Sequence, residues 1–266
     1  MLGTGRPILL LEPGAAAREV APARQAASAV YPVISCIMAS RGRLFPALLA
    51  IACYRRQSYA PRELVIVTAA RDGLLREAVA RLADPSIRLI ESAADANVGA
   101  LRNIAIAAST GDLLSVWDDD DLSHADRLSL QYRSMRDADA MGCFLARVIL
   151  WWPGREMLAV SCPRVWENTM LVERADFPPY PGSHARGEDT MVAEALRGSH
   201  RLILYDVPEA YCYVAHGENL WHADHFEMLF RGASRSFVGS AYGRMIDVLS
   251  ADLPLADYAA GLVLPN

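Results

Sequence analysis

Residues 113–121 read Leu-Leu-Ser-Val-Trp-Asp-Asp-Asp-Asp, a short apolar run that passes directly into four consecutive aspartates. The apolar part, 113–117, predicts a buried β-strand. Four adjacent carboxylates repel one another, so a folded protein keeps them together only in open solvent or around a cation. A solvated acidic loop is the simpler interpretation, but the position directly after a predicted buried strand favours a cation site.

Upstream of this stretch, apolar runs alternate with segments whose apolar residues recur at helical spacing. The predicted strands span 33–38, 64–67 and 87–90, and the predicted helices span 44–56, 73–82 and 99–109. This alternation requires crossover connections, so we expect an α/β fold with a Rossmann-like, mostly parallel sheet flanked by helices. Ligands bind beyond the carboxyl ends of such strands, which is where the aspartates are expected.

The regular alternation ends near residue 136, and two further strands, 144–150 and 158–160, are predicted in an irregular second half. Residues 1–30 carry Gly, Pro and Ala before the first predicted strand and are assigned no chemistry. The apolar run Ile8–Leu11 is too short for a signal peptide or a membrane span. We therefore expect a cytoplasmic protein, and peripheral association with the inner face of a membrane stays open.

Composition narrows the function classes. The 266 residues carry a net charge of −5, and all 26 basic residues are arginine. No basic stripe of the kind that nucleic-acid binding needs is present, so no nucleic-acid partner is expected. The five cysteines form no C-x-x-C pair, which argues against a disulfide framework and a thiolate zinc site. A phosphate-bearing ligand would have to be met by a metal or by a few placed arginines.

Four segments, in this order, resemble the motifs of family-2 inverting glycosyltransferases over residues 31–225. They are Pro32–Arg41, Asn97–Asn103, Gly111-Asp112 leading to the aspartates, and Arg186–Thr190. The resemblance implies a GT-A fold and transfer of a hexosyl group, with inversion, from a nucleotide-diphosphate sugar to a hydroxyl acceptor such as a glycan or a lipid-linked sugar. It divides the chain into an N-terminal extension (1–30), a nucleotide-sugar half (31–135), an acceptor half (136–225) and a C-terminal helical tail (226–266).

The resemblance also implies roles for acidic residues. A D-x-D motif that binds Mn²⁺ or Mg²⁺ maps onto Asp118 and Asp120, with Asp121 as an alternate ligand. Side chains alternate along an extended segment, so Asp118 and Asp120 can face one side together. Asp189 matches the general base and Glu188 is expected to orient the acceptor. Without the resemblance, this pair could simply favour the N-terminus of the helix predicted at 190–196.

Other positions are predicted to meet the nucleotide. The predicted contacts are Ser40, Arg41, Asp72, Asn97, Arg102, Asp118 and Asp119. Family members carry an acidic pair after the second strand that recognises the base. This chain instead reads Val67-Thr68-Ala69-Ala70-Arg71-Asp72, so UDP is only the default nucleotide. The alternative for Arg102 is a surface pair with Asp112 or another acid.

A histidine-rich segment, 216–225, follows the predicted acceptor half. The resemblance makes His216 a candidate metal ligand, although a structural role is the larger expectation. The spacing of His216, His222 and His225 matches no zinc motif. Trp151, Trp152 and Trp221 are candidates for stacking on sugars, whereas isolated tryptophans are more often core residues.

Two alternatives remain. The first is a non-catalytic GT-A-like protein that binds a nucleotide sugar, although every acidic position that turnover requires is present. The second is a sugar-phosphate nucleotidyltransferase, whose glycine-rich loop should follow the first strand. The Gly-Thr-Gly-Arg sequence at residues 3–6 has no predicted strand before it. A nucleotide-sugar hydrolysis screen against a pyrophosphorylase assay separates the two enzyme classes.

Overall fold

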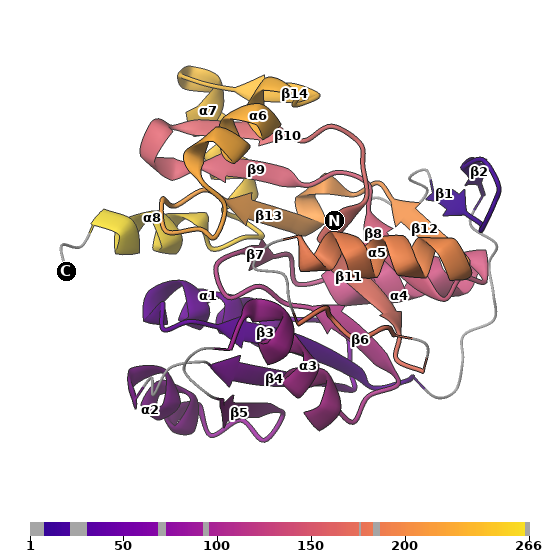
Figure 1. The fold of residues 1–266 in the computed structure, drawn as a ribbon. Helices are drawn as coiled ribbons and strands as arrows, with labels where there is room; N and C mark the ends of the chain where they lie inside the picture. The colour runs from indigo at the N-terminus through magenta and orange to yellow at the C-terminus, as the bar shows by residue number, and fades with distance from the viewer. Residues whose placement is uncertain are drawn as a thin grey trace.

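The computed structural model describes residues 8–21, 31–68, 73–92, 96–175, 177–182 and 187–263. Its first half is the predicted series of strands and crossover helices (Figure 1). The strands are β3 (Ile34–Ser40), β4 (Arg62–Thr68), β5 (Ile87–Glu91) and β6 (Leu113–Val116). The helices are α1 (Leu44–Arg55), α2 (Gly73–Leu82) and α3 (Val98–Ala108). These four strands are parallel, in the order β6-β3-β4-β5, so their carboxyl ends share one edge.

The large sheet continues beyond β6 in a mixed pattern. Its described strands have the order β2-β1-β12-β8-β11-β6-β3-β4-β5. The additional strands are β1 (Ile8–Leu11), β2 (Arg18–Val20), β8 (Gly142–Leu145), β11 (Trp166–Glu173) and β12 (Leu202–Tyr205). β11 runs antiparallel to both β6 and β8. The α/β class is confirmed, and the parallel pairing is concentrated in the first half.

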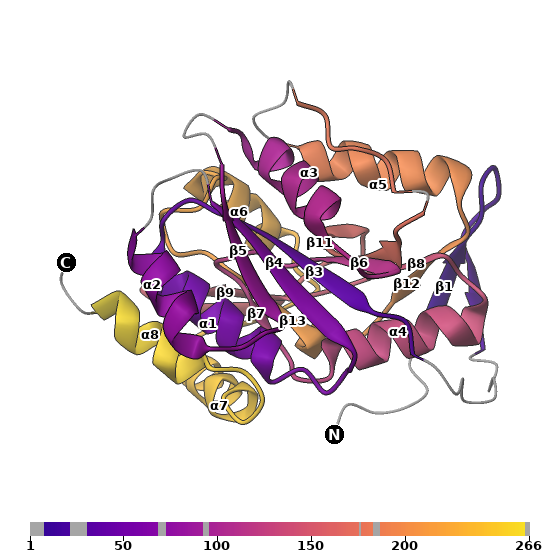
Figure 2. The same ribbon diagram turned by 90° about the horizontal axis from the view of Figure 1, so that it is seen from below.

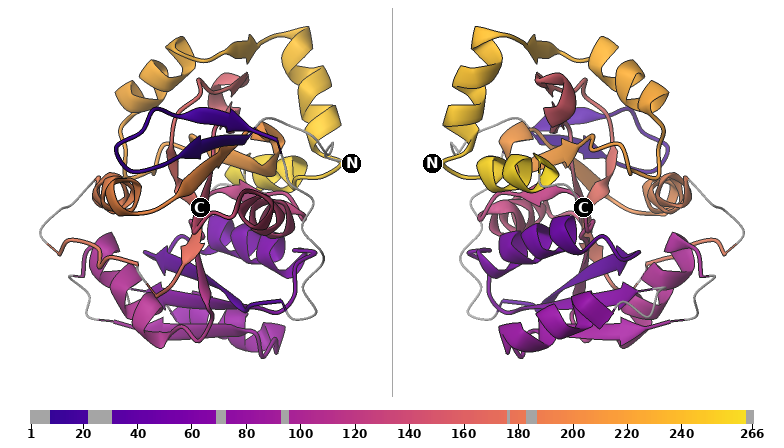
Figure 3. Two further views of the ribbon diagram at one scale, coloured as in Figure 1. Left: turned by 90° about the vertical axis from the view of Figure 1, so that its right-hand side faces the viewer. Right: turned by 90° about the vertical axis from the view of Figure 1, so that its left-hand side faces the viewer.

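Part of the predicted N-terminal extension belongs to this sheet. β1 pairs with β12 in antiparallel register from Ile8 opposite Tyr205 to Leu11 opposite Leu202. Figure 3 shows the indigo β1–β2 hairpin on the half of the molecule that carries the acceptor-half strands. The apolar run of the first residues is therefore a sheet strand, and its apolar side chains Ile8, Leu10 and Leu11 are buried. No helix in the described ranges is long and apolar enough to span a bilayer.

A second, smaller sheet forms the other half of the molecule. Its described strands have the order β14-β10-β9-β13-β7. They are β7 (Leu122–Ser123), β9 (Ile149–Trp152), β10 (Met157–Val160), β13 (Tyr211–Val214) and β14 (Arg235–Phe237). The prediction of one strand over 144–150 was wrong, because β8 and β9 belong to different sheets. The chain changes sheet at Arg147, whose guanidinium forms a two-bond ion pair with Asp206.

Helices cover both faces of the large sheet, as Figure 2 shows along the sheet edge. The remaining helices are α4 (Arg127–Ala138), α5 (Glu188–Ser199), α6 (Ala223–Arg231), α7 (Ser240–Leu249) and α8 (Leu255–Val263). Side chains alternate along β3: Cys36 and Met38 enter the core cluster that includes α1 and α4, and Ile37 enters the cluster that includes α3 and α5. This packing holds the carboxyl edge of β3 and β6 in a fixed position.

Candidate functional site

The acidic run begins where β6 ends, and its four carboxylates have two different environments. The side chains of Asp118 and Asp120 are 21% and 13% exposed, whereas Asp119 and Asp121 are each 3% exposed. Asp118, Asp119 and Asp120 line a cavity of about 180 Å³ that also borders the start of α5. The structure therefore places the predicted D-x-D pair where solvent and a ligand can reach it.

Asp119 is anchored to the end of β3. Its Oδ2 accepts a hydrogen bond of 2.7 Å from Ser40, and its Oδ1 accepts one of 2.6 Å from Arg43. Burial raises the pKa of Asp119 to about 6, and the charge of Asp120 adds to the effect. Ser40, which was predicted to meet the nucleoside, is fully buried. Its hydroxyl instead fixes the acidic run to the neighbouring strand.

Asp120 faces two basic side chains. Its Oδ2 lies 2.7 Å from Nη1 of Arg43 and 3.0 Å from Nε2 of His216. Burial acts to raise the pKa of Asp120, but the hydrogen bonds and charges of His216 and Arg43 outweigh it and lower the pKa. Tyr258 of α8 donates to the backbone carbonyl of Asp120, so the C-terminal helix also holds this segment.

His216 lies beside the acidic run, as expected. Both of its ring nitrogens are already engaged in hydrogen bonds. Its Nδ1 accepts a hydrogen bond from the backbone N–H of Glu218. The proton of a neutral ring therefore lies on Nε2 and is donated to Asp120. In this arrangement His216 orients the carboxylate of Asp120, and metal ligation would require the turn at 216–218 to move.

Asp121, the predicted alternate metal ligand, is not part of the cavity lining. Its Oδ2 accepts from the hydroxyl of Tyr211 at 2.6 Å, and its Oδ1 accepts from the backbone N–H of Val214 at 2.8 Å. Burial raises its pKa. Both oxygens are thus bound to β13, the adjacent strand of the small sheet. Asp121 thus links the end of the acidic run to the small sheet.

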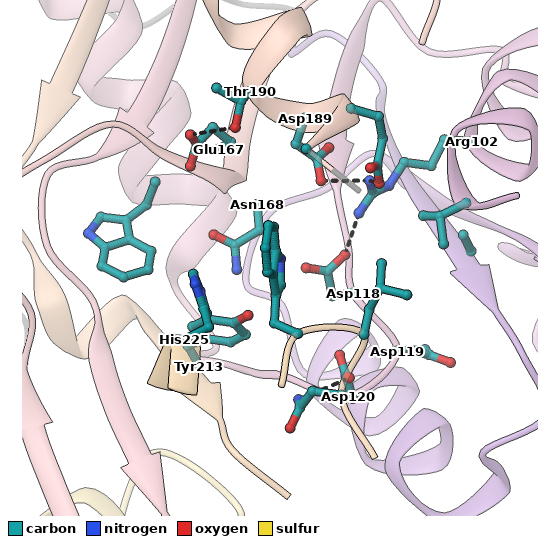
Figure 4. A pocket seen from close by; sticks show the side chains of 18 of the residues that line it. Arg102, Asp118, Asp119, Asp120, Glu167, Asn168, Asp189, Thr190, Tyr213 and His225 are labelled. Carbon is teal, nitrogen blue, oxygen red and sulfur yellow. Dashed lines mark hydrogen bonds and ion pairs between the residues drawn. The ribbon is translucent and has the colours of Figure 1, made fainter. Parts of the chain in front are cut away.

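Arg102 connects the two acidic motifs, as Figure 4 shows. Its guanidinium donates to Asp118 at 2.8 Å, to Asp189 at 2.7 Å and to Glu188 at 3.0 Å. Its side chain is only 5% exposed. The alternative interpretation of Arg102, a surface pair with Asp112 or another acid, was wrong in that Arg102 is buried, whereas its predicted contact with the nucleotide stays a prediction. A buried cation needs carboxylate partners, and these three acids supply them.

The two carboxylate oxygens of Asp189 have different environments. Gly187, with φ of +76°, turns the chain into α5, so that Glu188 and Asp189 lie in its first turn. Oδ2 of Asp189 binds Arg102, whereas Oδ1 is buried and has no hydrogen-bond partner among the described residues. Burial raises the pKa of Asp189 to about 6, although Arg102 acts to lower it. A carboxylate with this pKa is ionised at neutral pH and can accept a proton.

Aromatic side chains form another wall of the same cavity. They are Trp166 of β11, Tyr213 of β13, Trp221 and His225. Trp221 and His225 stack with ring centroids 4.6 Å apart. Nε1 of Trp166 is buried and has no partner among the described residues. This wall offers aromatic ring faces to a ligand with apolar faces, such as a sugar.

The other two predicted stacking tryptophans lie outside this cavity. Trp151 is 1% exposed and packs in the core, and its indole N–H donates to Tyr242. Trp152 packs against Phe226 and Phe230. For these two residues the alternative interpretation, a core role, is confirmed.

The remaining predicted nucleotide contacts do not gather in the cavity. Asn97 caps α3 by accepting the N–H of Ala100, and its amide donates to Gly182. Arg41 is exposed and donates to the carbonyl of Ala96. Asp72 lies outside the described residues, as do Arg186 and the Gly-Thr-Gly-Arg segment at 3–6. Of the predicted site residues that the structure describes, the acidic residues, Arg102, Ser40 and His216 are brought together, whereas Arg41 and Asn97 are not in the cavity lining.

The donor set suits a divalent cation that is shared with a ligand. Asp118 and Asp120 are the more exposed of the three carboxylates of the run that line the cavity, and Asp120 already binds a cationic guanidinium. Among the residues that the structure describes, no three His, Cys, Asp or Glu side chains form a complete ligand set. Mg²⁺ typically uses one or two carboxylates together with phosphate oxygens and water. The residues present fit that pattern.

Several residues of the site were not predicted. Arg43 lies three positions after the end of β3, so a search for basic residues at carboxyl strand ends would have found it. Trp166, Tyr211 and Tyr258 come from strands or helices of the irregular second half. No periodicity in the sequence indicates that these segments approach the acidic run.

Comparison with known proteins agrees with this geometry. The sequence model of the family described as Glycosyl transferase family 2 matches residues 35–180, more than half of the chain. No curated protein sequence matches the chain. Similar solved structures include residues 1–349 of S. aureus TarS in complex with UDP. That structure has a TM-score of 0.57 and 12% identity over 75% of this chain and 70% of that chain.

Two further structures share the fold. TarS of S. aureus has a TM-score of 0.56 and 14% identity, with 70% of this chain and 37% of that chain covered. The mannosyltransferase PcManGT from Pyrobaculum calidifontis, in complex with GDP-Man and Mn²⁺, has a TM-score of 0.53 and 16% identity over 70% of this chain and 57% of that chain. This chain thus spans well under half of the TarS chain. From its sequence match and its GT-A fold, the chain belongs to glycosyl transferase family 2.

Proposed function

We propose that this protein transfers a sugar from a nucleoside-diphosphate sugar to a hydroxyl acceptor, with inversion, in the presence of Mn²⁺ or Mg²⁺. The observation that carries the proposal is the bridge made by Arg102. It joins Asp118, at the end of β6, to Asp189, at the start of α5, within one cavity. A carboxylate for a metal–diphosphate group and a carboxylate for a proton thus lie on opposite sides of one guanidinium.

Asp118 and Asp120 are the residues that would hold the cation. A bound divalent cation supplies positive charge against the negative charge that develops on the departing diphosphate. Ser40 and Tyr258 keep the run in place by binding Asp119 and the backbone of Asp120. UDP is the default nucleotide; one similar structure holds UDP, another holds GDP-Man with Mn²⁺, and both fit this chemistry.

Asp189 is proposed as the general base. Its Oδ1 accepts the proton of the acceptor hydroxyl while the acceptor oxygen bonds to the anomeric carbon and the bond from that carbon to the phosphate oxygen breaks. Arg102 holds Oδ2 at 2.7 Å and thereby fixes the orientation of the carboxylate at the cavity. One base and one displacement invert the configuration at the anomeric carbon. Glu188, buried and bound to Arg102, supports this geometry.

The aromatic wall supports a carbohydrate acceptor, either a glycan or a lipid-linked sugar. A sugar presents apolar C–H faces, which the partly exposed ring of Trp221 can meet. Acceptor contacts arise here from β11, β13 and the segment before α6, all in the predicted acceptor half. A cytoplasmic location, at or near the inner face of a membrane, remains our proposal.

The test measures release of nucleoside diphosphate from UDP-GlcNAc, UDP-glucose and GDP-mannose, with Mn²⁺ or with EDTA. We expect release from one donor with Mn²⁺ and none with EDTA. Undiminished release in EDTA would refute metal dependence. Binding of a donor without release, even with an oligosaccharide mixture as acceptor, would favour the binding-protein alternative. Pyrophosphate-dependent formation of a nucleoside triphosphate would favour the nucleotidyltransferase alternative.

A further inference from the structure

Arg43 occupies the position that a cation would take on the acidic run. Its Nη2 lies 2.6 Å from Oδ1 of Asp119, and its Nη1 lies 2.7 Å from Oδ2 of Asp120. The guanidinium thus bridges two consecutive carboxylates, one of which, Asp120, is assigned to the metal. A divalent cation and Arg43 cannot both bind the same Oδ2 at full strength, because their charges repel at that distance.

The same guanidinium also holds a segment over the cavity. Nη1 of Arg43 donates to the backbone carbonyl of Glu218 at 3.2 Å and lies 3.3 Å from Nε2 of His216. Asn219 adds a bond of 3.5 Å to Asp120 and one of 2.8 Å to the carbonyl of Val214. The segment 216–221 supplies Asn219, Leu220 and Trp221 to the cavity lining. Arg43 therefore ties the acidic run to one wall of the site.

We infer that Arg43 holds the cation position when no donor is bound and transfers to the donor's diphosphate when the metal binds. This inference rests on the proposed function and deepens it. Asp118 and Asp120 are the two carboxylates that we assign to the metal among the described residues, and Arg43 competes for Asp120. A diphosphate changes this balance, since it gives the metal further oxygen ligands and gives Arg43 a new anionic partner. Metal and nucleoside diphosphate therefore bind together, and each strengthens binding of the other.

Arg43 and the neighbouring Arg41 make different contacts. The Arg43 side chain is 23% exposed and binds two carboxylates, whereas Arg41, two residues earlier, is exposed and binds the backbone carbonyl of Ala96. Both carry the same charge on the same loop after β3. Arg41 is thus a matched control for the effect of removing one positive charge near the site.

The experiment measures the affinity of Mn²⁺ by electron paramagnetic resonance for the unmodified protein, Arg43→Gln and Arg41→Gln, with and without UDP. Without UDP, we expect Arg43→Gln to bind Mn²⁺ about tenfold or more tightly than the unmodified protein, and Arg41→Gln to change affinity by less than about threefold. With UDP, we expect a smaller gain in Mn²⁺ affinity for Arg43→Gln than for the unmodified protein. Arg43→Met serves if Arg43→Gln does not fold, as judged by circular dichroism.

Two outcomes separate this inference from the proposed function. Equal Mn²⁺ affinities for Arg43→Gln and Arg41→Gln, or an unchanged gain from UDP, would overturn the role of Arg43 and leave the glycosyltransferase proposal intact. Absence of Mn²⁺ binding to all three proteins, with UDP, GDP or neither, would refute the metal site itself.

Discussion

Asp189→Asn is the substitution that isolates the proposed base. Asn has nearly the same shape as Asp, and its carbonyl oxygen can still accept the hydrogen bond from Arg102. Arg102 keeps its other two carboxylates, Asp118 and Glu188, so the buried guanidinium remains compensated. The variant should fold and bind donor and metal normally. It loses only the group that accepts the acceptor's proton.

The size of the effect follows from general-base catalysis and from the pKa of Asp189. A positioned base contributes about 10²–10⁴ in rate, so the chemical step should slow by about 10² or more. A pKa of about 6 leaves the carboxylate about 90% ionised at pH 7 and about 10% ionised at pH 5. The rate of the unmodified protein should therefore fall about tenfold from pH 7 to pH 5, and Asp189→Asn should lose this dependence.

The effect of Asp189→Asn on the free energy of unfolding should be opposite in sign to its effect on the rate. Because burial raises the pKa of Asp189 above its unfolded value, the stabilisation from proton binding is fully present below about pH 4 and is lost as the pH rises through 6. Asn needs no proton to be neutral. Asp189→Asn should therefore be at least as stable as the unmodified protein at pH 7, as measured by urea unfolding.

Single-turnover rates beside donor affinities from calorimetry provide the assay. Glu188→Gln is the matched comparison, because it removes a charge from the same arginine. Near-normal turnover in Asp189→Asn would refute its role as base and leave a structural role at the start of α5, since Asn serves almost as well there. Normal turnover in Asp189→Asn combined with loss in Glu188→Gln would move the base to Glu188.

Two other outcomes follow from the structure. The product should carry inverted configuration, β from an α-linked donor, in its anomeric NMR coupling; a retained product would contradict a single displacement assisted by Asp189. Tyr211→Phe should lower the free energy of unfolding by about 1–3 kcal/mol, because it removes the hydrogen bond to the buried Asp121 and keeps the ring that packs on Arg127. An unchanged urea midpoint would show that Asp121 does not need this hydroxyl.

Local patterns in the sequence were sufficient to predict the first half of the fold. The strands β3 to β6 and the helices α1 to α3 lie within two residues of their predicted bounds. Each is a single apolar run or a single helical period, and each packs against its sequence neighbours. In the second half, the predicted strand 158–160 lies within β10 and the predicted helix 190–196 lies within α5, but most of the other strands were not predicted. β11 lies between β6 and β8 and antiparallel to both, and such long-range pairing leaves no local periodicity.

The candidate site shows the same limit. Alternation along the acidic run predicted that Asp118 and Asp120 face one side together, but Asp119 and Asp120 lie in a turn and all three side chains line the cavity. The sequence could not show that Asp121 binds Tyr211 or that Arg102 reaches Glu188 and Asp189, since these partners are 86 to 90 residues apart. Tertiary packing also decides that Trp151 is buried while Trp221 lines the cavity.

The central claim is that the acidic run binds a nucleoside diphosphate through a divalent cation. The most direct measurement is the melting temperature of the protein with UDP or GDP, with and without Mn²⁺, beside the Asp120→Asn variant. A ligand that binds the native state raises the melting temperature by mass action. We predict a rise with one nucleotide only when Mn²⁺ is present, and no rise in Asp120→Asn. No rise with either nucleotide and Mn²⁺, or an equal rise in Asp120→Asn, would contradict the claim.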